Sequence, residues 1–532
     1  MPSLVAAFLL IALPWLNPFA PGPSAAAVPL MFSWACAALL LVLCVHLPRR
    51  ALIGALVSAA AWAWLVAGLI SSLIGVAQYL GLGGQLLPWV NEAPFGQAFG
   101  NLRQRNQFAT LTCIALAALL WLATAVDARA PTAAGAEARE RDGEAEQPAP
   151  PAALLQGWPG WLAAALLAAG DAASTSRIGL LELVGLCLLQ AIWGGWREPV
   201  LRRLLLAALA GYLLASLFLP WIDGFGPFGN DAFARLRGGA GCQSRLILWA
   251  NVLHLIGERP LAGWGWGQLA YAQYITLFSG PRFCDLLDNA HDLPLQLAFD
   301  FGVPAALLVC AAFAWWVLRQ RPWAEMDARR RLAWSVVALI LLHSLVEYPL
   351  WYGPFQTAFA LSALWLLHTA PRQSFDKKQA AVPALSSQRA ITAIATATLT
   401  LLILAAIDYW RVSQIYLPTE QRAAAYQDDA LAAARGAWLF RGPARFALLT
   451  LTDATPQNAL FLRRLAEELL HYSPEPRVIE KLIESDLLLG RDEDARFHLA
   501  RFRAAWPKEC AAWLAKNPGF ARTLAPLPGA TQ

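Results

Sequence analysis

The stretch Cys284-Asp-Leu-Leu-Asp-Asn-Ala-His291-Asp-Leu-Pro-Leu-Gln-Leu297 places three carboxylates, an amide and an imidazole directly before an apolar run that continues to Leu318. A polar cluster at the mouth of a membrane helix is costly unless it faces water, a cavity or a ligand. We therefore expect His291 to lie at the water-exposed edge of an active site that the flanking membrane helices hold in place.

The composition is that of an integral membrane protein. Of the 532 residues, 58% are apolar and 14% are charged, whereas soluble domains carry roughly 25% charged residues. The formal charge of +5 is small, and the sequence has no nucleic-acid-binding motif. We expect an all-α, polytopic membrane protein that contacts membrane lipid and binds no nucleic acid.

Spanning helices need roughly 20 mostly apolar residues each. On that criterion we predict eleven spans, at about 4–20, 28–46, 52–80, 107–126, 155–172, 178–195, 202–220, 294–318, 332–347, 354–370 and 390–407. Lys and Arg gather in the loops after the second, fourth, sixth, eighth and tenth of these spans. The positive-inside rule then predicts a cytoplasmic N-terminus and a periplasmic C-terminus in a bacterial inner membrane.

The charged segments divide the chain further. Residues 1–407 form the predicted transmembrane domain, with a disordered cytoplasmic linker at 127–153 and a large periplasmic loop at 221–293. Residues 408–532 form a predicted periplasmic α-helical domain, with amphipathic patterns at about 419–437, 443–452, 456–471, 476–489, 491–505 and 508–515. That domain either contacts an acceptor or partner, or stabilises the fold.

His291 has the chemistry of a general base or acid, since an ordinary imidazole pKa lies near ~6.5. Asp288, Asn289 and Asp292 flank it and are expected to orient the ring and to raise its basicity. A metal site built from Asp285, Asp288, His291 and Asp292 is the alternative reading.

Two arginines break the positive-inside pattern on the external side. Arg177 lies between the fifth and sixth spans with almost no loop, and Arg245 lies in the first turn of a predicted helix over 243–256. A guanidinium group can donate two parallel hydrogen bonds to the oxygens of one phosphate, so both residues are candidates for binding a diphosphate. The alternative for Arg177 is that its side chain extends to the lipid headgroups. In the predicted 243–256 helix, Leu246, Trp249, Leu253 and Ile256 share one face.

A second polar group ends the ninth span, in His343-Ser-Leu-Val-Glu347-Tyr348. His343 precedes Glu347 by one helical turn on the same face, which indicates either a site or an internal hydrogen-bond network. Cys242 and Cys284 both fall in the external loop, where a disulfide between them is possible.

These residues carry a family resemblance. The set Gly100-Asn-Leu-Arg-Gln104-Arg-Asn106-Gln, Ser176-Arg177-Ile-Gly, Arg245-x-x-x-Trp249, Asn289-Ala-His291-Asp-x-Pro-Leu-Gln and His343-Ser-x-x-Glu347-Tyr348-Pro-Leu-Trp351 resembles the PglL-type bacterial O-oligosaccharyltransferases of the O-antigen ligase and polymerase superfamily. The resemblance covers most of residues 1–410 and, more loosely, the C-terminal domain.

The resemblance implies an enzyme that moves a glycan from undecaprenyl diphosphate to Ser or Thr of a periplasmic protein such as pilin, without metal or cofactor. His291 matches the catalytic histidine, Tyr348 a tyrosine important in the protein-glycosylating branch, and Arg177 and Arg245 the diphosphate-binding arginines. Supporting roles fall to the remaining polar residues of these motifs and their neighbours, which are Gln104, Asn106, Asp288, Asn289, Asp292, His343 and Glu347. The alternatives are an O-antigen ligase that uses lipid A core, an O-antigen polymerase, or a transporter of lipid-linked glycans.

Overall fold

The computed structural model describes residues 2–46, 49–124, 151–222, 224, 241–369 and 385–524. Within these ranges the regular elements are helices and there is no β-strand, which confirms the predicted all-α class. The linker predicted at 127–153 lies outside the described residues up to residue 150, and its last residues begin the short helix α6 (Pro151–Leu154).

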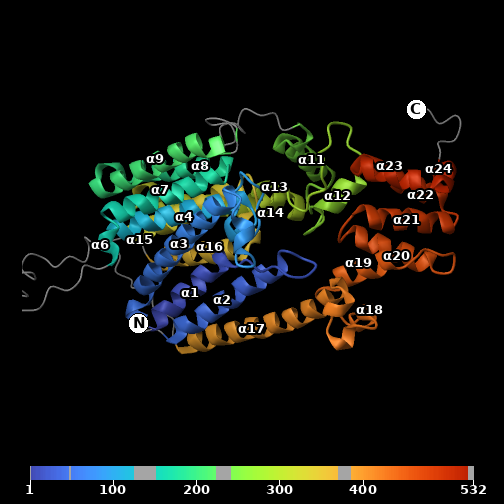
Figure 1. Ribbon diagram of the computed structural model, residues 1–532, viewed down its shortest axis with the longest axis horizontal. Coiled ribbons are helices and arrows are strands. Elements are labelled where there is room, and N and C mark those ends of the chain that lie inside the picture. The colour runs from blue at the N-terminus through green and yellow to red at the C-terminus, as the bar shows by residue number, and fades with distance from the viewer. Residues whose placement is uncertain are drawn as a thin grey trace, which may run out of the picture. The chain divides into compact units, whose positions relative to one another are not determined.

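The helices of the chain (Figure 1) form two compact units. The first comprises Met1–Ala20, Ala25–Gly238 and Trp315–Leu402. The second comprises Pro21–Ser24, Gly239–Ala314 and Ile403–Gln532. The second unit therefore combines the predicted external loop from Gly239 onward with the C-terminal helices.

Helix α4 is the centre of the first unit. It packs against α3, α7, α8 and α15, and every residue from Gln107 to Ala123 is buried. Small residues allow this close packing, since a Cβ on Gly68 of α3 would lie 2.3 Å from the Cβ of Ala115. The main helices of the unit are α1 (Pro2–Leu16), α2 (Ala27–His46), α3 (Arg49–Tyr79), α4 (Arg105–Thr124), α7 (Trp158–Ala173), α8 (Arg177–Ile192), α9 (Pro199–Ile222), α15 (Ala328–Ser344) and α16 (Gly353–His368).

Six described helices are long and apolar enough to cross a membrane, namely α2, α3, α4, α9, α14 (Val303–Gln320) and α17 (Leu385–Ser413). The other five predicted spans coincide with α1, α7, α8, α15 and α16, which have 15 to 17 residues each. The six candidate spans are consistent with a polytopic membrane protein, and the number of eleven crossings stays a prediction.

The eighth predicted span, 294–318, is divided at Gly302 into α13 (Leu293–Phe301) and α14. Gly302 has φ +87°, and a Cβ there would lie 2.1 Å from the carbonyl oxygen of Leu261. Only glycine fits this position. The apolar run that follows the polar stretch is therefore two helices, and α13 carries the end nearest His291.

The second unit begins with α11 (Arg245–Glu258) and α12 (Leu269–Ile275). The predicted helix over 243–256 is confirmed, but its predicted apolar face is only half right, since Ile256 is buried and Trp249 packs against the core while Leu246 and Leu253 do not. The buried apolar residues are Leu248, Val252, Leu255 and Ile256, whereas Leu246 and Leu253 are 72% and 55% exposed. The core partners of α11 on α12 and α13, including Leu269 and Phe299, decide which side is covered.

The C-terminal helices of this unit are α18 (Ala430–Ala433), α19 (Arg441–Leu451), α20 (Ala459–Leu470), α21 (Pro476–Leu488), α22 (Asp492–Ala505), α23 (Pro507–Lys516) and α24 (Pro518–Thr523). The predicted helix at 419–437 is wrong, because short turns and α18 occupy that segment. There the amide oxygen of Gln414 accepts from the N–H of Ala423 at 2.9 Å, a side-chain bond that replaces a helical one. Tyr274 of α12 belongs to the same apolar core as α20, α21 and α22.

Candidate active site

His291 lies in the turn that leads into α13. Its backbone has φ +54°, and its N–H donates to the side-chain oxygen of Asn289 at 2.8 Å. Asp292 caps α13, since its carboxylate accepts from the N–H of Leu295 at 2.8 Å. The imidazole is 7% exposed, so His291 is more enclosed than the water-exposed edge that the sequence predicted.

The hydrogen bond of the ring selects its tautomer. Nδ1 lies 3.0 Å from the carbonyl oxygen of Asn289. A carbonyl can only accept, so Nδ1 carries the proton and the lone pair is on Nε2. A neutral ring in this tautomer can accept a proton at Nε2.

Burial, and then the positive charge of Arg245, lower the pKa of His291 to about 4, against a smaller opposite effect of the bond to Asn289. The expected increase in basicity from the neighbouring carboxylates is therefore wrong. Asp288 is exposed, and Asp292 is engaged in capping. At neutral pH the imidazole is uncharged, which suits a proton acceptor.

Helices α11 and α13 together fix the residue before His291. Trp249 of α11 donates from its indole N–H to the carbonyl oxygen of Ala290 at 3.2 Å. Gln296 of α13 accepts from the N–H of Ala290 at 2.7 Å. Arg245 is the first residue of α11, after the capping residue Ser244, and is half-buried.

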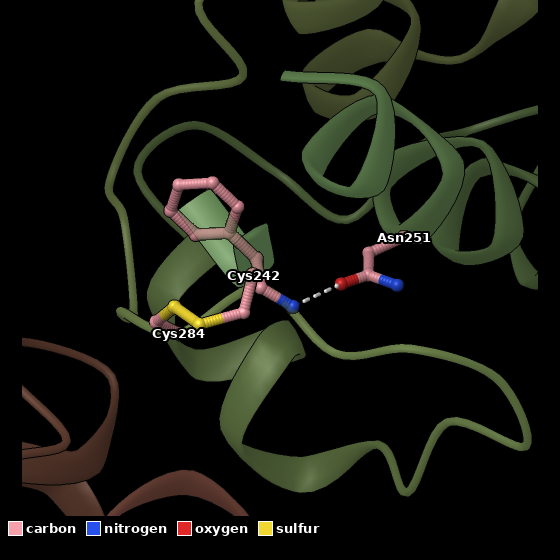
Figure 2. Close-up of a disulfide and its surroundings, with 4 residues drawn as sticks. Cys242, Asn251 and Cys284 are labelled. Atoms are coloured by element: carbon pink, nitrogen blue, oxygen red, sulfur yellow. Dashed lines mark hydrogen bonds between the residues drawn. A yellow bond between two sulfur atoms is a disulfide. The ribbon is translucent and has the colours of Figure 1, made fainter. Parts of the chain in front are cut away.

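A disulfide joins Cys242 and Cys284, as the sequence suggested (Figure 2). It connects the start of α11 to the segment that carries His291. Beside it, the amide oxygen of Asn251 accepts from the N–H of Phe283 at 2.9 Å, and its amide nitrogen donates to the carbonyl oxygen of Pro281 at 2.9 Å. The α11 helix and residues 281–284 are thus tied both covalently and by hydrogen bonds.

In the first unit, Glu347 gathers two of the predicted residues. Asn106 donates to one carboxylate oxygen of Glu347 at 3.1 Å, and Gln104 lies 3.4 Å from the other. The Glu347 side chain is 6% exposed. Residues from two distant motifs of the sequence therefore meet at one carboxylate.

Asn106 also reaches the start of α8. The hydroxyl of Ser176 donates to the amide oxygen of Asn106 at 2.7 Å, and it accepts from the N–H of Gly179 at 3.3 Å as the helix cap. Arg177 follows as the first residue of α8, with an exposed side chain. Glu347, Asn106 and Ser176 thus form a chain of hydrogen bonds that ends beside Arg177.

His343 makes a second connection one turn away. Its Nδ1 lies 2.7 Å from the hydroxyl of Thr110 on α4, and that hydroxyl lies 2.9 Å from a carboxylate oxygen of Glu182 on α8. All three residues are fully buried. Sequence reasoning missed Thr110 and Glu182, although an acidic residue inside an apolar span is itself a signal of function.

Tyr348 follows Glu347 among other aromatic residues. Its ring stacks on Tyr352, with centroids 5.8 Å apart, and meets Trp351 edge-on at 6.4 Å. Among the described residues, no three or more His, Cys, Asp or Glu side chains are arranged to hold a metal ion. The alternative site of Asp285, Asp288, His291 and Asp292 is therefore not formed.

The predicted residues thus fall into two clusters. His291, Asn289, Asp292 and Arg245 belong to the second unit, and Asp288 there points away into solvent. The first unit contains the other cluster, made of Gln104, Asn106, Arg177, His343, Glu347 and Tyr348.

Three protein families match this chain in different segments. The family described as "Protein glycosylation ligase" matches residues 98–123, the family "O-Antigen ligase" matches 162–310, and "Virulence factor membrane-bound polymerase, C-terminal" matches 331–518. These segments include the motifs around Asn106, Arg177, His291 and Glu347. No solved structure matches the chain.

Two curated relatives come from Acinetobacter baylyi. The "General O-oligosaccharyltransferase" is 27% identical over 150 residues, which cover 28% of this chain and 25% of the relative. The "ComP-specific O-oligosaccharyltransferase" is 27% identical over 125 residues, or 24% of this chain and 22% of the relative. The aligned part thus spans about a quarter of each relative. Together, the three family matches and the two relatives support the resemblance of this chain to the PglL-type proteins of the O-antigen ligase superfamily.

Proposed function

We propose that this protein is an O-linked oligosaccharyltransferase that moves a glycan from undecaprenyl diphosphate to Ser or Thr of a periplasmic protein, of which a pilin is one example. The observation that carries the proposal is the state of His291, a neutral imidazole with its lone pair on Nε2, held beside Arg245. The relatives, named as O-oligosaccharyltransferases, support a protein acceptor.

The chemical step exchanges one bond of the anomeric carbon for another and moves one proton. The acceptor oxygen attacks the anomeric carbon of the glycan, and the bond between that carbon and the phosphate oxygen breaks. The hydroxyl proton passes to Nε2 of His291, and the bonding electrons leave with undecaprenyl diphosphate. No metal is needed in this balance. The proton on His291 then returns to solvent.

Arg245 and Arg177 are proposed to bind the diphosphate. The leaving group gains negative charge as the bond breaks, and preorganised cations stabilise that charge. Arg245 begins α11 in the same unit as His291. Arg177 is exposed at the start of α8, and the chain through Ser176, Asn106 and Glu347 positions it. Tyr348 is proposed to bind the incoming hydroxyl or the sugar.

The membrane arrangement follows the positive-inside rule. We propose eleven crossings of the bacterial inner membrane, a cytoplasmic N-terminus, and a periplasmic C-terminal helical domain. The disulfide between Cys242 and Cys284 supports an oxidising compartment for the 221–293 loop. Periplasmic exposure of that loop would place His291 on the side where a lipid-linked glycan and a secreted acceptor meet.

A second candidate function is ligation to lipid A core or polymerisation of O-antigen. The matches to "O-Antigen ligase" over 162–310 and to a membrane-bound polymerase over 331–518 favour it. The same His291 and Arg245 chemistry would serve either reaction, because only the acceptor hydroxyl differs. Glycan transport is the third reading, since transporters also place ionisable residues within membranes.

The test is transfer by the purified full-length protein in detergent, where no gradient can drive transport. Undecaprenyl-diphosphate-linked glycan is incubated with a pilin-like protein, and separately with lipid A core. We expect glycan on Ser or Thr of the protein, and the same rate with EDTA. Glycan on lipid A core alone establishes the ligase, and chains of repeated glycan units establish the polymerase. No transfer to any acceptor contradicts the proposal.

A further inference from the structure

A pocket of about 250 Å³ lies within the first unit, next to the Glu347 cluster. Its walls come from the end of α1, the start of α2, the start of α4 and the segment that precedes α16. Gln104 and Tyr348 both line it, so it adjoins residues of the proposed function. The proposed function gives Tyr348 a contact with the incoming hydroxyl or the sugar, but it assigns no role to Gln107 or to the rest of the pocket wall.

One side chain of the pocket indicates that the pocket binds a ligand. Gln107 lines it and is 1% exposed, yet its amide nitrogen has no hydrogen-bond partner among the residues that the structure describes. A buried amide is nearly always paired. The amide of Gln107 is therefore a donor that an occupant of the pocket would satisfy.

The other polar residues of the pocket already have partners within the protein. Gln104 reaches Glu347, Asn101 donates to the carbonyl oxygens of Leu16 and Trp89, and Arg103 donates to that of Pro18. These bonds hold the wall in place. Gln107, three residues after Gln104 on α4, is the polar group left for a ligand.

The rest of the wall is aromatic. Tyr348, Trp351 and Tyr352 line the pocket, and Tyr348 stacks on Tyr352. A sugar ring matches this combination, since its C–H face packs on aromatic rings while its hydroxyls accept from amides. An acyl chain would leave Gln107 unsatisfied. The volume is below the roughly 300–1,000 Å³ of pockets for drug-sized ligands, which fits one sugar ring.

We propose that this pocket binds a single sugar ring of the lipid-linked donor, with the amide of Gln107 donating to a sugar hydroxyl and the aromatic wall packing on the ring. The inference rests on the proposed function for the identity of the donor. It assigns to Gln107 a role in recognising the glycan, separate from the recognition of diphosphate by Arg177 and Arg245.

The experiment compares ligands that differ in the sugar. Full-length protein in lipid nanodiscs is titrated with bare undecaprenyl diphosphate, and with undecaprenyl diphosphate carrying N-acetylglucosamine or galactose. We expect wild type to bind at least one glycosylated lipid about tenfold more tightly than the bare lipid. Gln107→Leu should abolish that gain and leave the affinity for the bare lipid unchanged.

Three variants make the result specific. Gln190→Leu removes a similarly buried glutamine on α8 that does not line the pocket, and should change neither affinity. Trp351→Leu removes an aromatic wall and should reduce the gain, whereas Trp351→Phe should keep most of it. Thermal unfolding of each variant checks that it folds.

The titrations distinguish a sugar site from the alternatives. If the sugar increases the affinity for undecaprenyl diphosphate equally in wild type and in folded Gln107→Leu, the inference is wrong and the proposed function is unaffected. An equal change for bare and glycosylated lipid indicates a bound acyl chain and also overturns it. If wild type binds none of the lipids, the proposed donor fails. Sugar binding in the pocket is then tested by saturation-transfer NMR with free N-acetylglucosamine and galactose. A signal that is present in wild type and lost in Gln107→Leu supports the sugar site. The absence of a signal in wild type overturns the inference.

Discussion

The neutral form of His291 has a measurable consequence for the pH dependence of activity. Its pKa is lowered to about 4 by burial and by Arg245, so the ring is unprotonated at every pH well above that value. A general base must be unprotonated, and kcat/KM reports the free enzyme. We expect kcat/KM to be flat from pH 5.5 to 7.5 with respect to this group, and to fall as the pH drops through about 4.

Two variants test whether the fall of kcat/KM at low pH comes from protonation of His291. His291→Ala should lower the rate by roughly 10²–10⁴-fold, the usual contribution of a general base. Arg245→Gln removes the cation that opposes protonation, so the midpoint should move to higher pH even though donor binding also weakens. A midpoint near 6.5 in wild type, or no movement in Arg245→Gln, would contradict this assignment. Preincubation at low pH followed by assay at pH 7 excludes denaturation.

Asn106 connects Glu347 to the start of α8, and its loss should affect Arg177. Asn106→Leu breaks the bonds to Glu347 and Ser176, and leaves the carboxylate with a weaker set of donors. Losses of hydrogen bonds to charged groups cost about 1.5–3 kcal/mol. We expect kcat/KM for the lipid-linked donor to fall about 10- to 100-fold, mainly through KM.

The matched control lies on the same helix. Thr112→Val likewise removes a hydrogen-bonding side-chain group from α4, but this group is a hydroxyl that donates to the carbonyl oxygen of Ala109 within the same helix. Its kinetics should stay within about twofold of wild type. If Asn106→Leu and Thr112→Val behave alike, the chain from Glu347 to Arg177 has no role in donor binding.

At the scale of residues, the sequence points to candidate side chains but does not reveal their surroundings. His291, Asn289 and Arg245 were found as candidates because rare polar groups in an apolar chain need a reason. Their effect on pKa was predicted with the wrong sign, since burial and the approach of Arg245 depend on packing between α11 and α13. Gln107 was passed over for the same reason, because the sequence does not reveal which amides lack a partner.

Among the elements, α11 depends on the disulfide at its start. Cys242 and Cys284 are 42 residues apart, and closing such a loop restricts the unfolded chain by about 3–4 kcal/mol in the entropic account. Replacing both cysteines with serine should therefore speed amide exchange in α11. It should also raise KM for the donor, because Arg245 follows Cys242 by three residues.

A different cysteine provides the comparison. Cys310→Ser changes a thiol of α14 that forms no disulfide, and should leave exchange in α11 unchanged. Unaltered protection of α11 in the double serine variant would show that the hydrogen bonds of Asn251 suffice to hold this element.

The spacing of apolar residues predicted helices well where one face of the helix packs against a single core. Helices α20, α21 and α22 bury apolar residues at helical spacing, as Leu462, Leu465 and Leu469 illustrate, and their predicted bounds were close. Periodicity failed at Gly302, where a contact with Leu261 decides the break, and on α11, whose covered side is chosen by α12 and α13. Contacts between distant segments are absent from any local pattern.

Over the whole molecule, the number of crossings determines the side of the C-terminal helices. Among the residues that the structure describes, six helices are long and apolar enough to span a membrane, and six crossings would leave both ends of the chain on one side. Eleven crossings would leave them on opposite sides. Helices of 15 to 17 residues, such as α7 and α8, are about 23–26 Å long at 1.5 Å per residue, slightly short of a ~30 Å hydrocarbon core.

We expect the short helices to cross, because their shortfall is small and bilayers thin locally around short spans at modest cost. Their sequences are mostly apolar, and the buried carboxylate of Glu182 on α8 accepts from the hydroxyl of Thr110 on α4. Alkaline phosphatase fused after residue 524 should then be active, since it folds only in the periplasm, and a fusion within 127–150 should be inactive. A cytoplasmic fluorescent reporter at the same two sites should give the opposite pattern. Inactive phosphatase at residue 524 would favour an even number of membrane crossings, and would place the C-terminal helices on the side of the membrane away from a periplasmic acceptor.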